Sequence, residues 1–174
     1  TGDFFCADVQ TWVGWENSDA SLHRYGISNV IFDGAAQHGG IRLRDLDQGH
    51  MVPWGIPYNN FHTSLVQACR FENCSTGVEL MSMQAAALRH NWFVSNAVGV
   101  TATQTTNWPY LRPYNAIEVA YNVFAWCEEN GISGGIYSNL VYRNNTLYSC
   151  GGTGVTFRAG KLGPYGTAAL YNTI

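Results

Sequence analysis

The chain has 174 residues, of which 46% are hydrophobic and only 12% are charged, and its formal net charge is −3. This length allows one domain with a real core. The charge gives no basic footprint for nucleic acid, and no apolar run approaches the ~18 residues of a membrane span. With 19 Gly, 10 Tyr, 8 Phe and 6 Trp, the composition favours a turn-rich β protein with a polar and aromatic surface.

One unit recurs along residues 26–174. Its clearest copies are "CRFENCSTGVEL" (69–80), "NWFVSNAVGVTA" (91–102), "NVFAWCEENGIS" (122–133) and "NTLYSCGGTGVTF" (145–157). The large apolar residue of each copy is, in chain order, Phe32, Phe71, Phe93, Phe124, Leu147 and Ile174. Two residues before it stand Val30, Cys69, Asn91, Asn122, Asn145 and Asn172. Such agreement in register indicates an internal repeat.

A glycine followed by a β-branched residue comes six to eight residues after each of the first five large apolar residues. These glycines are Gly40, Gly77, Gly99, Gly131 and Gly154. Their spacings are 37, 22, 32 and 23 residues, so two copies carry insertions into a unit of about 22. Only residues 80–90 hint at a helical period, and the rest is typical of short strands broken by Gly, Asn and Ser turns.

If the units stack in parallel, like residues lie about 4.8 Å apart in successive strands. The large apolar residues then form one inward column. Asn91, Asn122, Asn145 and Asn172 are predicted to form an asparagine ladder at a tight turn, each amide bonded to the next. The alternative is a set of unrelated turn asparagines, because Asn favours turns in any fold.

The repeat "N-x-F-x-x-N-x-x-G-[VI]" resembles that of right-handed parallel β-helix proteins such as pectate lyases, polygalacturonases, alginate lyases and phage tailspikes. The resemblance covers residues 26–174 and implies an all-β solenoid of about six coils with loop insertions on one side. Residues 1–174 are expected to form one domain, with 1–25 as a first coil or approach segment. Because "AALYNTI" stops midway through a coil, a longer natural chain or end-to-end and homo-oligomeric association is expected.

Three cysteines lie three residues after the large apolar column, with an asparagine in the same column. They are Cys74, Cys127 and Cys150, and the asparagine is Asn96. Cys127 and Cys150 belong to successive coils, within the reach of a disulfide. The alternative is a stack of reduced thiols that pack as small hydrophobic groups.

Outward residues and insertions provide the candidate polysaccharide-binding site. One outward column contains Arg42 and Glu79, and the next contains Arg44. The insertions 45–62, 104–115 and 159–167 follow the same strand of their coils and are expected on one side. The substrate-binding candidates are Arg42, Arg44, His50, Trp54, Trp108, Tyr110, Tyr114 and Tyr165. Their aromatic rings can stack on sugars, and their arginines can bind uronate carboxylates.

The resemblance implies a lyase of an acidic polysaccharide with an Arg or Lys base. Arg158, Lys161 and Arg112 are the candidates for that base, and Glu79 is a candidate carboxylate for a hydrolase. No cofactor is required by any motif, but "DLDQG" (45–49) faintly resembles a Ca²⁺ loop through Asp45 and Asp47.

Three functions therefore remain open at this point. The first is a secreted polysaccharide lyase, with a glycoside hydrolase as the second choice of enzyme. The second is a glycan-binding or adhesive solenoid without catalysis, and the third is a structural segment of a fibre. The protein is expected to be extracellular or at the cell surface, with no nucleic acid partner and no membrane span. The first two functions have a polysaccharide as the partner.

Overall fold

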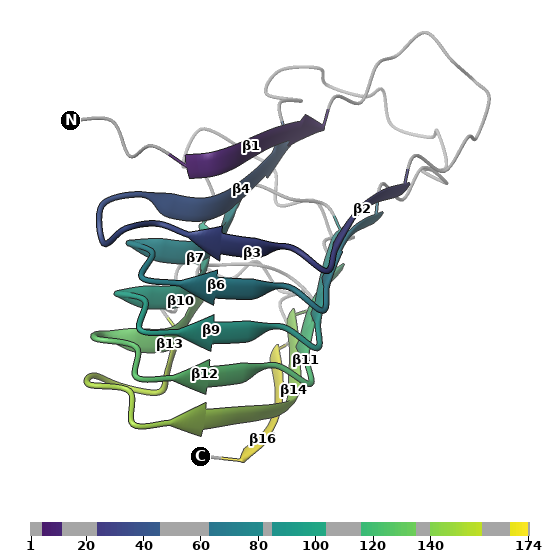
Figure 1. The fold of residues 1–174 in the computed structure, drawn as a ribbon. Helices are drawn as coiled ribbons and strands as arrows, with labels where there is room; N and C mark the ends of the chain where they lie inside the picture. Colours follow the sequence, from purple (N-terminus) through teal and green to yellow (C-terminus); the bar gives the residue numbers. More distant parts are fainter. Residues whose placement is uncertain are drawn as a thin grey trace, which may run out of the picture.

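The computed structural model describes residues 5–11, 24–45, 63–81, 85–103, 116–134, 140–157 and 168–173. Within these ranges the chain forms strands joined by turns, and every strand pairing is parallel (Figure 1). No helix in the described part of the chain has the length and apolar character needed to cross a membrane.

One six-stranded sheet, called here the first wall, has the strand order β1-β4-β7-β10-β13-β15. Its strands are β1 (Phe5–Thr11), β4 (Gly39–Asp45), β7 (Thr76–Met81), β10 (Val98–Thr103), β13 (Asn130–Gly134) and β15 (Val155–Phe157). Because each strand pairs with the next one in parallel, the wall grows by one strand per repeat.

The ten-stranded sheet forms two further walls that meet at a corner. The second wall contains β2 (Arg24–Ser28), β5 (Thr63–Gln67), β8 (Ala85–Arg89), β11 (Ala116–Ala120) and the first half of β14 (Leu140–Tyr148). The third wall contains β3 (Ile31–Asp33), β6 (Arg70–Glu72), β9 (Trp92–Val94), β12 (Val123–Ala125) and the second half of β14. Strand β16 (Ala168–Thr173) pairs with β14.

Each repeat passes through the second wall, the third wall and then the first wall before the next repeat begins one strand further along (Figure 1). The fold is therefore the expected right-handed parallel β-helix. Of residues 80–90, which hinted at a helical period, 80–81 end β7 and 85–89 form β8. Ala86 and Leu88 of β8 are buried and pair in register with β5 and β11, so strand pairing and packing override the helical propensity of the alanines. The expected coil number stays a prediction.

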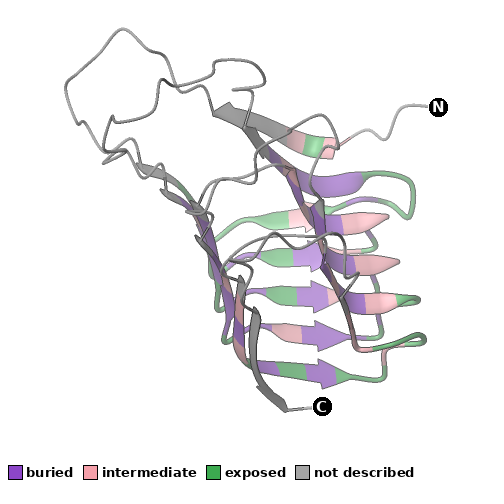
Figure 2. Cartoon of the chain, turned by 180° about the vertical axis from the view of Figure 1, so that it is seen from behind, coloured by how far each residue is buried: buried purple, intermediate pink, exposed green. Residues whose placement is uncertain are grey.

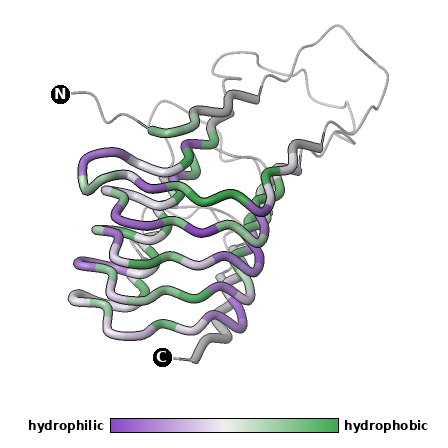
Figure 3. The backbone as a smooth tube through the Cα atoms, in the orientation of Figure 1, coloured by the Kyte–Doolittle hydropathy of each residue, from purple (hydrophilic) through white to green (hydrophobic). Residues whose placement is uncertain are grey.

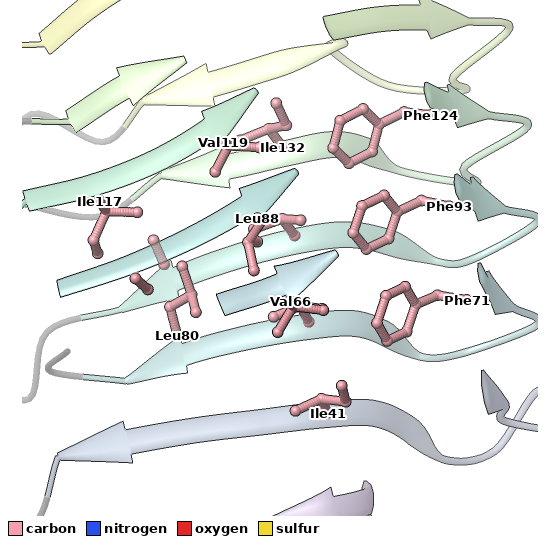
Figure 4. Close-up of a cluster of buried hydrophobic side chains, with 14 of the residues drawn as sticks. Ile41, Val66, Phe71, Leu80, Leu88, Phe93, Ile117, Val119, Phe124 and Ile132 are labelled. Atoms are coloured by element: carbon pink, nitrogen blue, oxygen red, sulfur yellow. The ribbon is translucent and has the colours of Figure 1, made fainter. Parts of the chain in front are cut away.

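The predicted register is confirmed where the structure describes it. Phe32, Phe71, Phe93, Phe124 and Leu147 pair in sequence along the third wall. The rings of Phe71 and Phe93 stack at 4.9 Å between centroids, and those of Phe93 and Phe124 at 4.7 Å (Figure 4). Offset or parallel aromatic pairs of this kind add about 0.5–1.5 kcal/mol each to their burial.

The glycine column exists because the phenylalanine column needs room. A Cβ on Gly99 would lie 2.5 Å from Cδ1 of Phe124 and 2.4 Å from the carbonyl oxygen of Gly131. Gly77 meets Phe93 in the same way, 2.6 Å from its Cδ1. Each ring thus packs on the glycine of the preceding coil. The buried residues recur at the same place in every coil, as Figure 2 shows.

The asparagine ladder is also confirmed for its three described side chains. The side-chain nitrogen of Asn91 donates to Oδ1 of Asn122 at 3.0 Å, and that of Asn122 donates to Oδ1 of Asn145 at 3.0 Å. All three asparagines are almost completely buried, and each also donates to a main-chain carbonyl of the preceding coil. The side chain of Asn172 lies outside the described residues.

Two corners per coil depend on left-handed backbone. The residue before the ladder has a positive φ in Asn29, Ala68, His90, Tyr121 and Asn144. The residue before the cysteine column has one in Asn73, Ser95, Trp126 and Ser149. Asparagine adopts this conformation readily, whereas Tyr121 and Trp126 do so at a cost of about 1–2 kcal/mol. The corner between the second and third walls is coloured largely hydrophilic in Figure 3.

Candidate functional site

Two of the predicted site residues lie side by side on the outer face of the first wall. Arg42 of β4 pairs in register with Glu79 of β7, and Nε of Arg42 donates to Oε2 of Glu79 at 2.5 Å. The guanidinium carbon of Arg42 also lies 4.2 Å from the centre of the Phe5 ring. Only 19% of the Arg42 side chain and 16% of the Glu79 side chain is exposed. Arg42 and Glu79 thus neutralise each other in an ion pair. Their roles in substrate binding or catalysis stay predictions.

The other predicted site residues fall mostly outside the described part of the chain. Arg44 and Asp45 belong to β4, which gives their backbone position only. Those that lie outside the described residues are Asp47, His50, Trp54, Trp108, Tyr110, Arg112, Tyr114, Arg158, Lys161 and Tyr165. The catalytic base and the Ca²⁺ loop therefore stay predictions.

The strands that precede the three insertions belong to one sheet. Segment 45–62 follows β4, segment 104–115 follows β10, and segment 159–167 comes after β15. All three strands belong to the first wall and run in parallel. The three strands therefore end at the same edge of the first wall, while the segments after them lie outside the described residues.

A group of exposed aromatic rings lies on the third wall, which contains none of the predicted site residues. Trp92 of β9 is 51% exposed, Trp126 after β12 is 55% exposed and Tyr148 of β14 is 59% exposed. The rings of Trp126 and Tyr148 meet edge to face, with 5.6 Å between centroids. We call these three residues the aromatic face.

The aromatic face arises from the alternation of the strands. Because Phe93 points inward in β9, its neighbour Trp92 points outward, and Leu147 and Tyr148 divide in the same way in β14. Strand β12 lies between β9, which carries Trp92, and β14, which carries Tyr148. In its register, Val123 pairs with Trp92 on one side and with Thr146 on the other. The outward residues of β12 are Val123, which is partly exposed, and Ala125, which is buried. The group of exposed rings makes the third wall a candidate binding surface.

A second group lies on the second wall and joins three successive strands. Glu118 of β11 accepts hydrogen bonds from Arg89 of β8, with Nε of Arg89 2.6 Å from Oε2. It also accepts from Arg143 of β14, with Nη2 of Arg143 2.6 Å from Oε1. Burial alone would raise the pKa of Glu118, but the hydrogen bonds and charges of the two arginines outweigh it and lower the pKa. The carboxylate therefore stays ionised and holds both guanidinium groups.

The corner residues extend this second group. The hydroxyl of Tyr121 accepts a hydrogen bond from Nη1 of Arg143 at 2.9 Å, and its ring lies 5.1 Å from the guanidinium carbon. The His90 ring stacks on the Tyr121 ring with 5.2 Å between centroids. Glu118 and Tyr121 were not singled out from the sequence. Their positions one residue before the inward Val119 and the ladder Asn122 were the available signal.

Cys74, Cys127 and Cys150 form one column along the solenoid, and they are free thiols. Cys69, Cys74 and Cys127 are buried, and none of the five cysteines is in a disulfide. Asn96 completes the column by accepting a hydrogen bond from the main-chain nitrogen of Cys74 at 2.8 Å. Burial raises the pKa of the Cys74 thiol to about 11, and burial together with the neighbouring Cys150 raises that of Cys127 to about 12. Both are therefore neutral near pH 7.

Metal donors do not converge in the part of the chain that the structure describes. Within those ranges, no three His, Cys, Asp or Glu residues are grouped so that they could hold a metal ion. The nearest approach to a donor set is the cysteine column, whose thiols would have to lose their protons to bind.

Comparison with known proteins gives one match. The family described as "Periplasmic copper-binding protein (NosD)" matches residues 14–163, which is most of the chain. No curated protein and no solved structure matches significantly. The description places the family in the periplasm, which agrees with a location outside the cytoplasm.

The family description also names copper, and the described residues do not fit it. Copper(I) prefers deprotonated sulfur and imidazole ligands in a convergent set. The buried thiols of Cys74 and Cys127 are held protonated, and the described donors do not converge. What the match does establish, together with the parallel sheets, is that the chain belongs to the NosD family of periplasmic β-helix proteins.

Proposed function

We propose that this β-helix binds a polysaccharide in the periplasm or at the cell surface, and that the aromatic face is its contact surface. The observation that carries the proposal is the exposure of Trp92, Trp126 and Tyr148 by more than half on one wall. Exposed aromatic rings that gather on one face are typical of interaction sites, so two tryptophans and a tyrosine together favour a ligand here.

The chemistry of these rings suits a sugar. Indole and phenol rings offer a flat apolar surface with one polar atom at the edge, which matches the apolar face and rim hydroxyls of a pyranose. The rings are carried by a rigid wall, since Phe93, Phe124 and Leu147 behind them are buried. A surface held this firmly loses little entropy on binding.

A binding assay with single polysaccharides tests the proposal. We expect wild-type protein to be retarded in native gels that contain a recognised polysaccharide. Trp92→Ala should weaken binding by about tenfold, which corresponds to ~1.4 kcal/mol for one stacked ring. Ile31→Ala is the control, because Ile31 is 69% exposed on the same wall but lies two strands from Trp92, on the side opposite to Trp126 and Tyr148. Equal binding by Trp92→Ala and wild type would contradict the proposal.

The same polymers test the predicted lyase reaction. A lyase leaves an unsaturated uronate whose ultraviolet absorbance grows with time. If the absorbance rises in the wild type and the rise disappears in Arg158→Ala or Lys161→Ala, these residues carry the reaction. Binding without any product assigns the chain to the class of non-catalytic glycan-binding solenoids.

A further inference from the structure

The arginines of the second wall are not needed to build the coil. In register with Arg89 and Arg143, the neighbouring strands carry Gln67 and Ala120. The column of Glu118 likewise contains Leu65, Ala87 and Val141. The wall therefore tolerates neutral residues at both positions. Exposed ion pairs also contribute only about 0–1 kcal/mol to stability, so stability alone does not explain the group.

The group leaves one positive charge in excess at the surface. Glu118 gives one oxygen to each arginine, and only 19% of its side chain is exposed. The arginine side chains are 46% exposed for Arg89 and 36% exposed for Arg143. Both arginine side chains are therefore more exposed than the carboxylate that holds them. Arg89 uses Nε and Nη2 on Glu118, and its Nη1 donates to no residue that the structure describes.

Arg143 is held in one orientation before any ligand arrives. Its Nε and Nη2 donate to Glu118, its Nη1 donates to Tyr121, and its plane lies over the Tyr121 ring. His90 supports the other side of that ring. A guanidinium fixed in this way loses little rotamer entropy when it binds an oxyanion.

The corner also brings this group close to the aromatic face in sequence and space. Tyr121 ends the second wall, and two residues later Val123 lies between Trp92 and Thr146 on the third wall. His90 and Trp92 stand in the same relation one coil earlier. A polymer on the third wall would meet the arginines where the chain turns the corner.

We propose that Arg89 and Arg143 bind an oxyanion carried by the polysaccharide, a carboxylate or a sulfate, with Glu118 and Tyr121 as positioning residues. This inference rests on the proposed function and adds that the ligand is acidic. Charge-assisted hydrogen bonds from a guanidinium to such an oxyanion are among the stronger contacts that a surface can offer.

Matched polymers with and without the charge test the inference. Polygalacturonate and its methyl ester differ only in the carboxylate, and dextran sulfate and dextran differ only in the sulfate. We expect the wild type to bind at least one charged polymer more tightly than its neutral partner. The double variant Arg89→Gln/Arg143→Gln should lose about 10- to 100-fold in affinity for that charged polymer and nothing for the neutral one.

The control variant is Arg70→Gln on the third wall, because Arg70 pairs in register with Trp92 and so lies beside the aromatic face but outside the Glu118 group. Arg70 is also an exposed arginine, 45% by side chain, that is paired with a glutamate, Glu72. It should leave the preference for the charged polymer intact, and equal unfolding midpoints for all variants would show that the fold is kept. The charged partner that loses affinity in the double variant identifies the oxyanion as carboxylate or sulfate.

Failure of this inference differs from failure of the proposed function. If charged and neutral polymers bind equally, or if the double variant keeps the preference, the oxyanion site is wrong while the aromatic face stands. If no polymer binds to the wild type, both are wrong. If Trp92→Ala weakens charged and neutral polymers alike while the double variant weakens only the charged one, both are supported.

Discussion

The side-chain oxygen of Asn122 accepts two hydrogen bonds from Asn91 of the preceding coil, one from its main-chain nitrogen at 2.9 Å and one from its side-chain nitrogen at 3.0 Å. The side-chain oxygen of a ladder asparagine therefore accepts hydrogen bonds from both the main-chain and the side-chain nitrogen of the preceding ladder asparagine. Since an unpaired buried amide costs about 1–3 kcal/mol, the ladder links the stability of one coil to that of the next.

We expect Asn122→Ala to lower the free energy of unfolding by about 2 to 3 kcal/mol, because it leaves the buried main-chain nitrogen of Asn91 without its acceptor. Urea unfolding followed by circular dichroism measures the change. Thr146→Ala is the control, because Thr146 is exposed and lies one residue from the ladder. Equal losses in the two variants would contradict the role of the ladder.

Gly99→Ala should destabilise the protein by about 1–3 kcal/mol, the usual cost of forcing an extra carbon into a packed core. The added Cβ meets a backbone oxygen at 2.4 Å and a buried ring at 2.5 Å, and neither can move freely. Gly26→Ala is the matched control, because a Cβ there has no neighbour within 4 Å. Thermal unfolding of both variants decides the matter, and a stable Gly99→Ala protein would show that the coils are more loosely packed.

Stability should fall as the pH rises above about 9. The ordinary pKa of a thiol is 9.0, and burial raises those of Cys74 and Cys127 to about 11 and about 12. Above pH 9 the unfolded chain releases these protons while the folded chain keeps them, so unfolding becomes more favourable. The slope is at most about 1.4 kcal/mol per pH unit for each thiol.

Unfolding curves at several alkaline pH values measure this slope. Cys127→Ala should flatten it, because it removes a thiol whose pKa burial raises. A slope that is the same in wild type and Cys127→Ala would mean that the Cys127 thiol is not the titrating group.

Copper binding, measured by competition with a chromophoric chelator of copper(I), should not depend on the buried thiols. Cys74→Ala and Cys127→Ala are expected to take up as much copper as the wild type, whatever that amount is. The reason is that both thiols are protonated and the described donors do not converge. A clear loss of copper in either variant would place a metal site in the cysteine column.

The fold was predictable because the repeat is written in residues whose packing is periodic. The columns of Phe71, Phe93 and Phe124 and of Asn91, Asn122 and Asn145 lie where the spacing put them. A ring or an amide inside a solenoid packs against the same residue type in the coils before and after it. Positions that align between repeats in the sequence therefore stack on one another in the structure.

The candidate site was less predictable, because outward residues carry no such periodic constraint. The prediction concentrated on the long insertions and overlooked Trp92 and Trp126, although alternation made Trp92 outward. Trp126 was hidden by its left-handed backbone, φ 54°, which a tryptophan rarely adopts. Whether Cys127 and Cys150 were bridged could not be read from spacing, because stacked thiols and a disulfide require the same register.

The hydrogen bonds between successive ladder asparagines bear on how the number of coils in such a chain can change. Oδ1 of Asn122 accepts a hydrogen bond from the main-chain nitrogen of Asn91 at 2.9 Å. Oδ1 of Asn91 accepts an equivalent bond from the main-chain nitrogen of Cys69 at 3.0 Å. Removal of the 31 residues that separate Asn91 from Asn122 would therefore bring one donor opposite an equivalent acceptor. Whole coils of this solenoid can therefore be gained or lost in evolution while the neighbouring coils keep their ladder hydrogen bonds.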